Sequence, residues 1–256
     1  MVSVIVLSWN ARDEIVACVD SLLEASKIIP LEIIVIDNAS GDDSVAYLEK
    51  YSDIKLVKNN TNRLYAGGNN QGYSLTKADL VLLLNQDTIV NGPAIKAMSD
   101  WLMQHPNYGG ATVKLLNLDG STQYHMHRRL PHWYDIPLGL LHKRIPAIMF
   151  NTTKKYLYLD NKFDQDFDIE QAAGACLMVR RTAIAQLGVL FDEPHFPLYY
   201  NDVDLCYRLH KAGWPIRCLT SVSIMHRKGT SVRKLPKWKN MKIYLRSLFY
   251  YFARFK

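Results

Sequence analysis

Short apolar runs that alternate with segments of helical periodicity most strongly limit the folds open to this chain. Residues 2–8, 32–36 and 80–84 consist almost entirely of apolar side chains and are rich in Val, Ile and Leu, which is typical of strands buried on both faces of a sheet. Between the first two runs, apolar residues recur at helical spacing over residues 13–24. This alternation predicts an α/β fold of the Rossmann-like type, in which helices flank a mainly parallel central sheet.

The same periodicities predict further elements. Helices are expected at residues 44–51, 69–77, 93–105, 182–187 and 203–212, and strands at residues 54–58 and 174–180. The helix at 69–77 is expected to follow a turn at Gly67 and Gly68, because glycine pairs favour turns. Residues 115–170 are rich in Tyr, His, Arg and Pro without a clear period, and we expect an irregular insertion over the active site.

Composition indicates a globular protein of ordinary make-up, with 48% hydrophobic and 21% charged residues in a chain of 256. The four cysteines show no CxxC spacing, so we expect reduced thiols in a cytoplasmic protein. The first ten residues lack a basic segment and a cleavage site, and their apolar run is too short to cross a bilayer. A first strand is therefore predicted there instead of a signal peptide.

Positive charge is concentrated at the C-terminal end. The net charge is +7, yet residues 226–256 contain ten of the 31 basic residues and no Asp or Glu. Residues 1–225 therefore combine the other 21 basic residues with all 24 acidic ones, a net charge of −3. The basic segment needs an explanation of its own.

Two carboxylates follow predicted buried strands directly. Asp37 ends the run at 32–36, and Asp87 lies just after the run at 80–84; ligands of open α/β sheets bind at such strand ends. Asp37 can accept a hydrogen bond from the N3–H of uracil or thymine or from a ribose hydroxyl, or it can cap a turn. Asp87 can hold Mg²⁺ or Mn²⁺ against a diphosphate, or it can cap the next turn.

Two further residues are candidates for chemistry nearer the C-terminus. Asp202, at the start of a predicted helix, can act as a general base; alternatively, it only complements the helix dipole. Asp204 is expected to be structural. His226 ends an apolar stretch and can be a metal ligand or a structural histidine.

Several short motifs follow one another along the chain. They are VIVLSWN (4–10), VIDNAS (35–40), YAGGNNQG (65–72), LLLNQDT (82–88), GACLMVRR (174–181), FDE (191–193), NDVDLCYRL (201–209) and AGW (212–214). In this order they resemble glycosyltransferase family 2, the inverting enzymes of the GT-A fold, and in particular the bacterial rhamnosyltransferase-like branch. The resemblance runs from residue 2 to about residue 231, so it covers the chain outside the tail.

The resemblance implies a role for each matching position. Asp202 falls on the general base, and Asp87 and His226 fall on the ligands of Mg²⁺ or Mn²⁺. The nucleotide-binding positions are Ser8, Trp9, Asn10, Asp37, Asn38, Gly67, Gly68, Asn69, Asn70 and Gln86. The resemblance also divides the chain into a GT-A domain at 1–231, with a nucleotide-binding half at 1–110 and an acceptor half at 111–231, and a tail at 232–256.

The chain departs from the family pattern at three positions. Asn85 replaces the first acid of the metal station, and Asn201 replaces a glutamate that often precedes the base. Asn69 stands where many relatives have an arginine near the nucleotide, which leaves thymidine open beside uridine.

The tail predicts a basic amphipathic helix. Leu245, Leu248, Phe249 and Phe252 fall on one helical face, accompanied by Lys and Arg residues. Such a helix fits an anionic membrane surface, which predicts a peripheral protein on the cytoplasmic face of the cell membrane. Packing on the domain and a dimer contact are the alternatives. Nucleic acid is not expected as a partner, because the other signals concern a small nucleotide.

These features together predict an inverting, metal-dependent hexosyltransferase. The expected donor is dTDP-L-rhamnose, with a UDP-sugar as the second choice, and the expected acceptor is a hydroxyl of a lipid-linked or surface polysaccharide glycan. The alternative is a catalytically weak scaffold that binds a nucleotide-sugar and partners another transferase at the membrane, because Asn85 and Asn201 leave fewer acids in the site.

Overall fold

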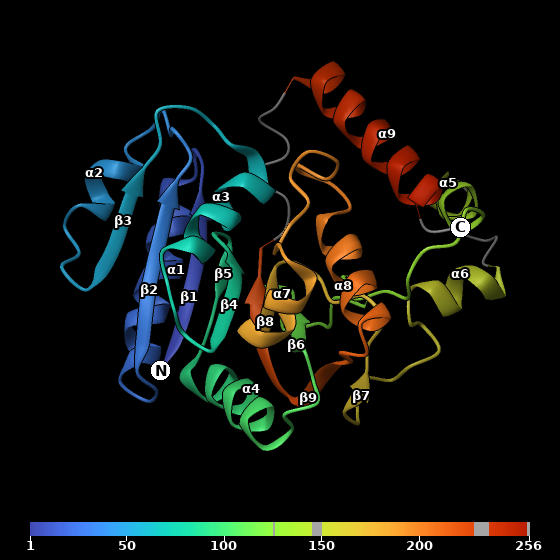
Figure 1. The fold of residues 1–256 in the computed structure, drawn as a ribbon, viewed down its shortest axis with the longest axis horizontal. Coiled ribbons are helices and arrows are strands. Elements are labelled where there is room, and N and C mark those ends of the chain that lie inside the picture. The colour runs from blue at the N-terminus through green and yellow to red at the C-terminus, as the bar shows by residue number, and fades with distance from the viewer. Residues whose placement is uncertain (125, 145–149, 228–235, 255–256) are drawn as a thin grey trace.

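The computed structural model describes residues 1–124, 126–144, 150–227 and 236–254 (Figure 1). Its strands are β1 (Val2–Ser8), β2 (Leu31–Asp37), β3 (Ile54–Lys58), β4 (Leu80–Asn85), β5 (Thr88–Ile89), β6 (Gly110–Leu116), β7 (Phe167–Asp168), β8 (Cys176–Arg180) and β9 (Ile216–His226). Its helices are α1 (Arg12–Ser26), α2 (Ser44–Leu48), α3 (Leu64–Ser74), α4 (Gly92–Gln104), α5 (Asp135–Arg144), α6 (Asn151–Tyr156), α7 (Arg181–Leu187), α8 (Asn201–Lys211) and α9 (Lys237–Arg254). The predicted boundary at 231/232 lies outside the described residues.

One mixed sheet runs through the molecule in the order β3-β2-β1-β4-β8-β6-β9-β5, with β7 paired to β9. The pairs β1–β2, β2–β3, β1–β4 and β6–β9 are parallel, whereas β8 runs antiparallel to both β4 and β6. The predicted α/β fold with a mainly parallel sheet is therefore confirmed. The strand order also joins the two predicted halves of the domain in a single sheet.

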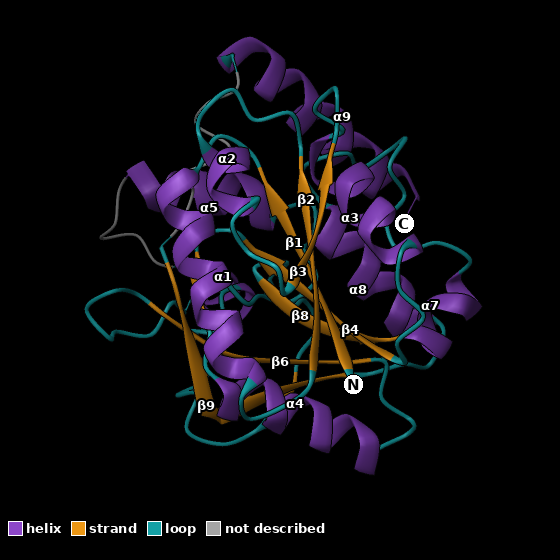
Figure 2. Cartoon of the chain, turned by 90° about the vertical axis from the view of Figure 1, so that its left-hand side faces the viewer, coloured by secondary structure: helices purple, strands orange, loops and turns teal. Residues whose placement is uncertain are grey.

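Each face of the sheet has its own hydrophobic core. Alternate residues of β1 point to opposite faces, because the side chains of a strand alternate. Val4 and Val6 pack with α1 and α4, whereas Ile5 packs with α3, α7 and α8. Figure 2 shows α1 and α4 on one side of the sheet and α3, α7 and α8 on the other. This double cover explains the nearly continuous apolar runs in the sequence.

Helix α3 corrects two expectations. It spans Leu64–Ser74, so it begins before the predicted range of 69–77, and the predicted turn at Gly67 and Gly68 is wrong because both lie inside the helix. The missing side chains allow close packing instead: a Cβ placed on Gly72 would come within 2.5 Å of Ile5 Cγ2 on β1. Glycine lowers helix propensity, which is why the sequence pattern placed a turn here.

Residues 115–170 are more regular than predicted. They contain α5, α6 and β7, so the expectation of a wholly irregular insertion is wrong. Strand β6, which begins at Gly110, was also not predicted. It pairs with β9 across a register shift between Val113 and Lys114, and such an irregularity breaks the simple period that a sequence pattern needs.

Helix α9 packs against the rest of the chain (Figure 1). Tyr199 Oη donates a hydrogen bond to Asn240 Oδ1 at 2.5 Å, and Ser247 Oγ donates one to the carbonyl oxygen of His195 at 3.1 Å. Near the end of the helix, Arg254 Nη1 lies 2.6 Å from Asp192 Oδ2. One face of the predicted amphipathic helix is therefore a packing surface. No helix among the described residues is both long and apolar enough to cross a bilayer.

Candidate active site

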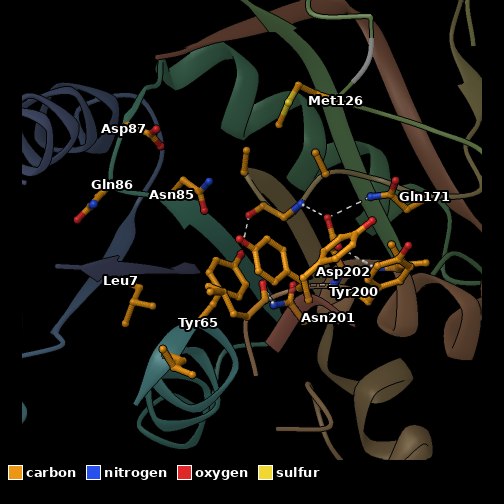
Figure 3. Close-up of a pocket in the computed structure, with 18 of the residues that line it drawn as sticks. Leu7, Tyr65, Asn85, Gln86, Asp87, Met126, Gln171, Tyr200, Asn201 and Asp202 are labelled. Carbon is orange, nitrogen blue, oxygen red and sulfur yellow. Dashed lines mark hydrogen bonds between the residues drawn. The ribbon is translucent and has the colours of Figure 1, made fainter. Parts of the chain in front are cut away.

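A cavity of about 420 Å³ lies at the carboxyl ends of β1 and β4. Figure 3 shows Asp87 on one side of this cavity and Asp202 on the other. Of the residues predicted for the site, Trp9, Asn38, Gln86, Asp87 and Asp202 line it. The cavity thus brings the predicted metal-binding acid and the predicted base into one space.

Asp202 is held by hydrogen bonds from three directions. Its Oδ2 accepts one from Gln171 Nε2 at 3.1 Å and one from the Gly174 N–H at 3.2 Å, and its Oδ1 accepts one from the Val203 N–H at 2.9 Å (Figure 3). Burial raises the pKa of Asp202, and the nearby positive charge of Arg128 opposes that rise. A carboxylate whose pKa is raised above its usual value is a stronger proton acceptor.

The backbone before α8 fixes the position of Asp202. Tyr200, just before the helix, adopts a left-handed conformation with φ of 62°, so the chain turns sharply into α8. The Asn201 amide then donates to the carbonyl oxygen of Leu198 at 2.8 Å and accepts from the Asp202 N–H at 2.7 Å. A glutamate has no amide donor for the first bond. The family departure at Asn201 therefore has a structural use.

Asp204 is structural, as expected. Its side chain is fully buried, and its Oδ2 accepts a hydrogen bond from Arg208 Nε at 2.7 Å, one turn further along α8. Asp202 and Asp204 therefore have different environments, although only one residue separates them.

The predicted metal ligands face each other. Asp87 follows β4, and His226 ends β9, which pairs with β5 so that Thr88 lies opposite His226. His226 Nε2 is 3.4 Å from Asp87 Oδ1, and it is buried without a hydrogen-bond partner. Both side chains are almost fully shielded from solvent. Adjacent strand pairing thus places two potential ligands in contact.

Gln123 settles which nitrogen of His226 carries the proton. Its Nε2 faces three acceptors, the carbonyl oxygens of His226 and Leu116 and the Asn117 side-chain oxygen, at 2.6, 3.1 and 3.0 Å. This fixes the orientation of the amide, so Gln123 Oε1 faces His226 Nδ1 at 3.1 Å and accepts a hydrogen bond from the Nδ1–H. In the neutral ring, His226 Nε2 then carries the lone pair, and this nitrogen faces an oxygen of Asp87.

This arrangement fits a divalent cation. Between a neutral His226 and the Asp87 carboxylate no hydrogen atom joins the two facing acceptors, and a cation bound by both would satisfy the orphaned Nε2. Mn²⁺ binds both imidazole nitrogen and carboxylate oxygen, whereas Mg²⁺ prefers the carboxylate oxygen. Among the described residues, no group of three or more His, Cys, Asp or Glu side chains could hold a metal ion. Asp87 and His226 are thus two candidate ligands, and a cation bound by them would have other positions open for a substrate.

Two unsatisfied polar atoms mark the ends of β1 and β2. Ser8 and Asp37 are direct neighbours across the parallel pair. Ser8 Oγ and Asp37 Oδ1 are both buried without a hydrogen-bond partner, while Asp37 Oδ2 accepts from the Ser40 N–H at 3.0 Å. One Asp37 oxygen thus caps a turn, and the other is buried and unsatisfied. The two readings of Asp37 in the sequence are compatible with each other.

The loop after β1 is held by its neighbours. The Trp9 N–H donates to Gln86 Oε1 at 2.8 Å, the Asn10 N–H donates to Ser40 Oγ at 2.9 Å, and the Gly41 N–H donates to Asn10 Oδ1 at 2.6 Å. Asn10 itself has a positive φ of 49°. Trp9 and Gln86 are thus bonded to each other, and Asn10 is bonded to the loop that follows Asp37.

Other predicted nucleotide contacts have packing partners. The amide of Asn69 is buried and donates to the carbonyl oxygen of Tyr65, and Asn70 exchanges two hydrogen bonds with the backbone of Phe191. A Cβ on Gly67 would meet Glu193, and one on Gly68 would meet Leu7. These four residues do not line the cavity. Their contact with a nucleotide stays a prediction.

The sequence pattern did not predict several residues of the site. Gln171 and Gly174 hold Asp202, Gln123 orients His226, and Arg128 lines the cavity beside the ring of Tyr156. Gln123 and Arg128 lie in the segment 115–170, which has no clear period, and Gln171 directly follows it. Gly174 alone carried a signal, since it opens the motif at 174–181.

Five tyrosines surround the space next to Asp202. They are Tyr65, Tyr156, Tyr199, Tyr200 and Tyr244. Tyrosine combines a large apolar ring with one polar end, so this wall can pack on an extended organic molecule and still offer hydroxyl groups. Tyr244 comes from α9, which makes the tail a part of the site.

The chain is similar to known glycosyltransferases. The N-acetylglucosaminyl-diphospho-decaprenol L-rhamnosyltransferase of Mycobacterium tuberculosis is 27% identical over 220 residues, which are 81% of this chain and 70% of that protein. The mannosyltransferase PcManGT from Pyrobaculum calidifontis, solved with GDP-Man and Mn²⁺, superposes with a TM-score of 0.60 at 18% identity, over 90% of this chain and 57% of that one. TarS 1-349 of S. aureus with UDP-GlcNAc also gives a TM-score of 0.60, at 17% identity, over 94% and 64%.

The two solved structures confirm the predicted GT-A type of fold, and they differ in the nucleotide-sugar that they hold. The chain spans less than two thirds of either solved chain. The family is shown by the sequence itself: the family model described as "Glycosyl transferase family 2" matches residues 3–188. That match covers well over half of the sequence, and the chain belongs to glycosyl transferase family 2.

Proposed function

We propose that this protein is a metal-dependent inverting glycosyltransferase, which moves a sugar from a nucleoside diphosphate to a hydroxyl group of a glycan. The observation that carries the proposal is the single cavity that holds Asp87 on one wall and Asp202 on the other. A transfer with inversion needs charge stabilisation on the leaving-group side and a proton acceptor on the opposite side of the sugar. The two walls supply these groups.

In the proposed step, Asp202 Oδ2 or Oδ1 takes the proton of the acceptor hydroxyl. The oxygen attacks the anomeric carbon, a new carbon–oxygen bond forms, and the bond to the phosphate oxygen breaks. The nucleoside diphosphate leaves with the electron pair. Gln171 and Gly174 hold the carboxylate in place through their hydrogen bonds. Because the carboxylate is already ordered before the reaction, it loses less conformational entropy in the transition state.

Asp87 and His226 would hold the divalent cation, and Gln123 would keep His226 in the ligating tautomer. A bound cation supplies charge neutralisation for the departing diphosphate. On the nucleoside side, Asp37 Oδ1 can accept the N3–H of uracil or thymine, since it is buried and unsatisfied. The site thus has a proposed partner for the charge of the diphosphate and one for the N3–H of the base.

For the donor we favour dTDP-L-rhamnose over a UDP-sugar. The support for this donor is the similarity to the mycobacterial L-rhamnosyltransferase. Asn69, which stands where many relatives have an arginine, does not line the cavity and adds no support for either donor. For the acceptor we favour a lipid-linked or surface polysaccharide glycan. The five tyrosines offer a wall on which such an acceptor can pack, and the rhamnosyltransferase is named for a lipid-linked sugar.

The test begins with calorimetric binding of dTDP-rhamnose, UDP-glucose, UDP-galactose and GDP-mannose, each with and without Mn²⁺ or Mg²⁺. The donor that binds in a metal-dependent manner is then used for transfer assays on lipid-linked acceptors. We expect Asp202→Asn to keep donor binding and to lose at least about 100-fold in transfer rate, as is typical when a general base is removed. Asp164→Asn, at an exposed position, is the matched control.

Each outcome has a distinct meaning. Full transfer by Asp202→Asn would refute the assignment of the base. Metal-dependent donor binding without turnover on any acceptor would favour the scaffold that binds a nucleotide-sugar. If none of the four donors binds, the proposed donor class is contradicted.

A further inference from the structure

Helix α9 presents different chemistry on different faces. Its inward face packs on the domain, with Ser247 and Tyr251 buried and Tyr244 in the wall of the cavity. These residues lie three and four positions apart, so they form one side of the helix. The side of α9 that faces away from the domain is lined by other residues, and these are exposed to solvent.

An apolar row covers the outward side. Trp238, Met241, Leu245 and Phe249 follow one another at three- and four-residue spacing, which places them on one stripe. All four side chains are exposed; the exposed fraction is 72% for Trp238 and 71% for Phe249. Of the face predicted from the sequence, Leu245 and Phe249 belong to this stripe, whereas Leu248 and Phe252 are half-buried.

A basic row runs along the stripe. Lys239, Lys242 and Arg246 have the same three- and four-residue spacing and are exposed. The helix contains five basic residues and no acidic residue. Within the described part of the chain, none of these three cations forms an ion pair with a carboxylate of the protein. Two rows of unlike chemistry therefore lie side by side over most of the helix length.

We propose that this outward side of α9 binds the surface of an anionic lipid bilayer. Trp and Phe side chains of an interfacial helix enter the boundary between headgroups and acyl chains, while Lys and Arg beside them pair with anionic headgroups. A second copy of the chain fits less well: in a symmetric contact each patch faces itself, so the basic rows would approach each other without an acidic residue on the helix to compensate.

The proposal also gives the cavity an orientation. Tyr244 lies in the cavity wall while Leu245, the next residue, belongs to the exposed stripe. A bilayer that binds the stripe therefore lies next to the element that closes one side of the cavity. Binding itself needs no donor, metal or turnover, so it can be tested whether or not the proposed reaction is correct.

The experiment measures co-sedimentation of the full chain with vesicles of phosphatidylglycerol mixed with phosphatidylcholine, and with vesicles of phosphatidylcholine alone. Two variants are compared with the unaltered protein: Trp238→Ser with Phe249→Ser, and Lys239→Gln with Lys242→Gln and Arg246→Gln. Loss of three basic contacts, each worth about 1 kcal/mol near an anionic surface, should lower the partition coefficient about 100-fold. The apolar variant should lose at least about tenfold.

Matched controls carry the same changes elsewhere. Met103→Ser with Leu118→Ser removes two exposed apolar side chains, and Lys50→Gln with Lys55→Gln and Lys77→Gln removes three exposed charges. Both controls should bind as the unaltered protein does, and circular dichroism should show all variants folded. Equal binding by controls and α9 variants would overturn the proposal. So would a dimer in lipid-free solution that the Trp238 and Phe249 substitutions dissociate, because a second copy would then cover the stripe.

Discussion

At the scale of single residues, the site depends on side chains that hold other side chains. A neutral His226 directs its lone pair toward Asp87 because Gln123 accepts a hydrogen bond from the N–H of the other ring nitrogen. Gln123 is itself fixed by three acceptors around its amide nitrogen. Partners of this kind set the tautomer and direction of a metal ligand. The role of Gln123 is therefore that of a positioning residue, and it can be tested without turnover.

We expect Gln123→Leu to weaken Mn²⁺ binding about 10- to 100-fold in the presence of UDP or dTDP, because His226 loses the acceptor that fixes its tautomer. The measurement is titration of free Mn²⁺ by electron paramagnetic resonance. Gln104→Leu, at an exposed position on α4, is the control. A purely structural role would lower the melting temperature of Gln123→Leu and leave the Mn²⁺ dissociation constant unchanged, which would refute the assignment.

The pH dependence of transfer reports on Asp202. Burial raises its pKa, so the carboxylate takes up a proton at a higher pH than an exposed aspartate, whose pKa is about 3.9. As the pH falls, kcat/KM should therefore decline from a higher pH than that value. The charge of Arg128 lowers the pKa of Asp202, so Arg128→Gln should raise it and move the acid limb to still higher pH.

The check is a profile of kcat/KM against pH for the unaltered protein, Arg128→Gln and the surface control Lys96→Gln. An acid limb that stays in place or moves to lower pH in Arg128→Gln would contradict the role of Asp202 as the titrating base. The direction of the shift matters more than its size, because substrate charges in the cavity add to the field of Arg128.

At the scale of elements, the sequence was most informative where the periodicity is simple. β1 and β3 have the predicted bounds, β4 is one residue longer at its end, and β2 is one residue longer at both ends, since runs buried on both faces leave little ambiguity. Asp37 and His226 lie at strand ends and Asp87 just after one, as the sequence predicted; their roles stay predictions. The residues that support them, such as Gln123, come from segments whose contacts are distant in sequence, and a local pattern does not contain that information.

Helix α3 shows why propensity alone failed. Its glycines reduce helical propensity by about 1 kcal/mol each relative to alanine, yet Gly68 and Gly72 lie where the helix approaches Leu7 and Ile5 of β1 closely. We expect Gly72→Ala to lower the free energy of unfolding by about 1–3 kcal/mol despite the gain in propensity, because the new Cβ would lie 2.5 Å from Cγ2 of the fully buried Ile5.

Chemical denaturation of Gly72→Ala would measure this change. Gly41→Ala is the control, because its Cβ would meet no atom closer than 3.8 Å. If Gly72→Ala were as stable as Gly41→Ala or more stable, close packing would not be the reason for the glycine, and helical propensity would decide the outcome instead.

At the scale of the whole molecule, the proposed metal site joins distant parts of the sheet. Asp87 follows β4 in the predicted nucleotide-binding half, whereas His226 ends β9 in the predicted acceptor half, and the β5–β9 pair brings them together. The two halves share one sheet and one cavity. A donor held by both parts should therefore stabilise the entire fold and not only one half.

Only two protein ligands face each other in the described part of the chain, so metal and diphosphate should complete each other's binding. We expect Mn²⁺ and UDP or dTDP together to raise the melting temperature by more than the sum of their separate effects. At ligand concentrations about 100 times the dissociation constant, the gain is about 2.7 kcal/mol, or about 5–10 °C for a chain of this size. His226→Ala should lose the synergy, whereas His132→Ala, an exposed control, should keep it. Additive shifts in the unaltered protein would mean that metal and nucleotide bind at separate places, and the assignment of Asp87 and His226 would then fail.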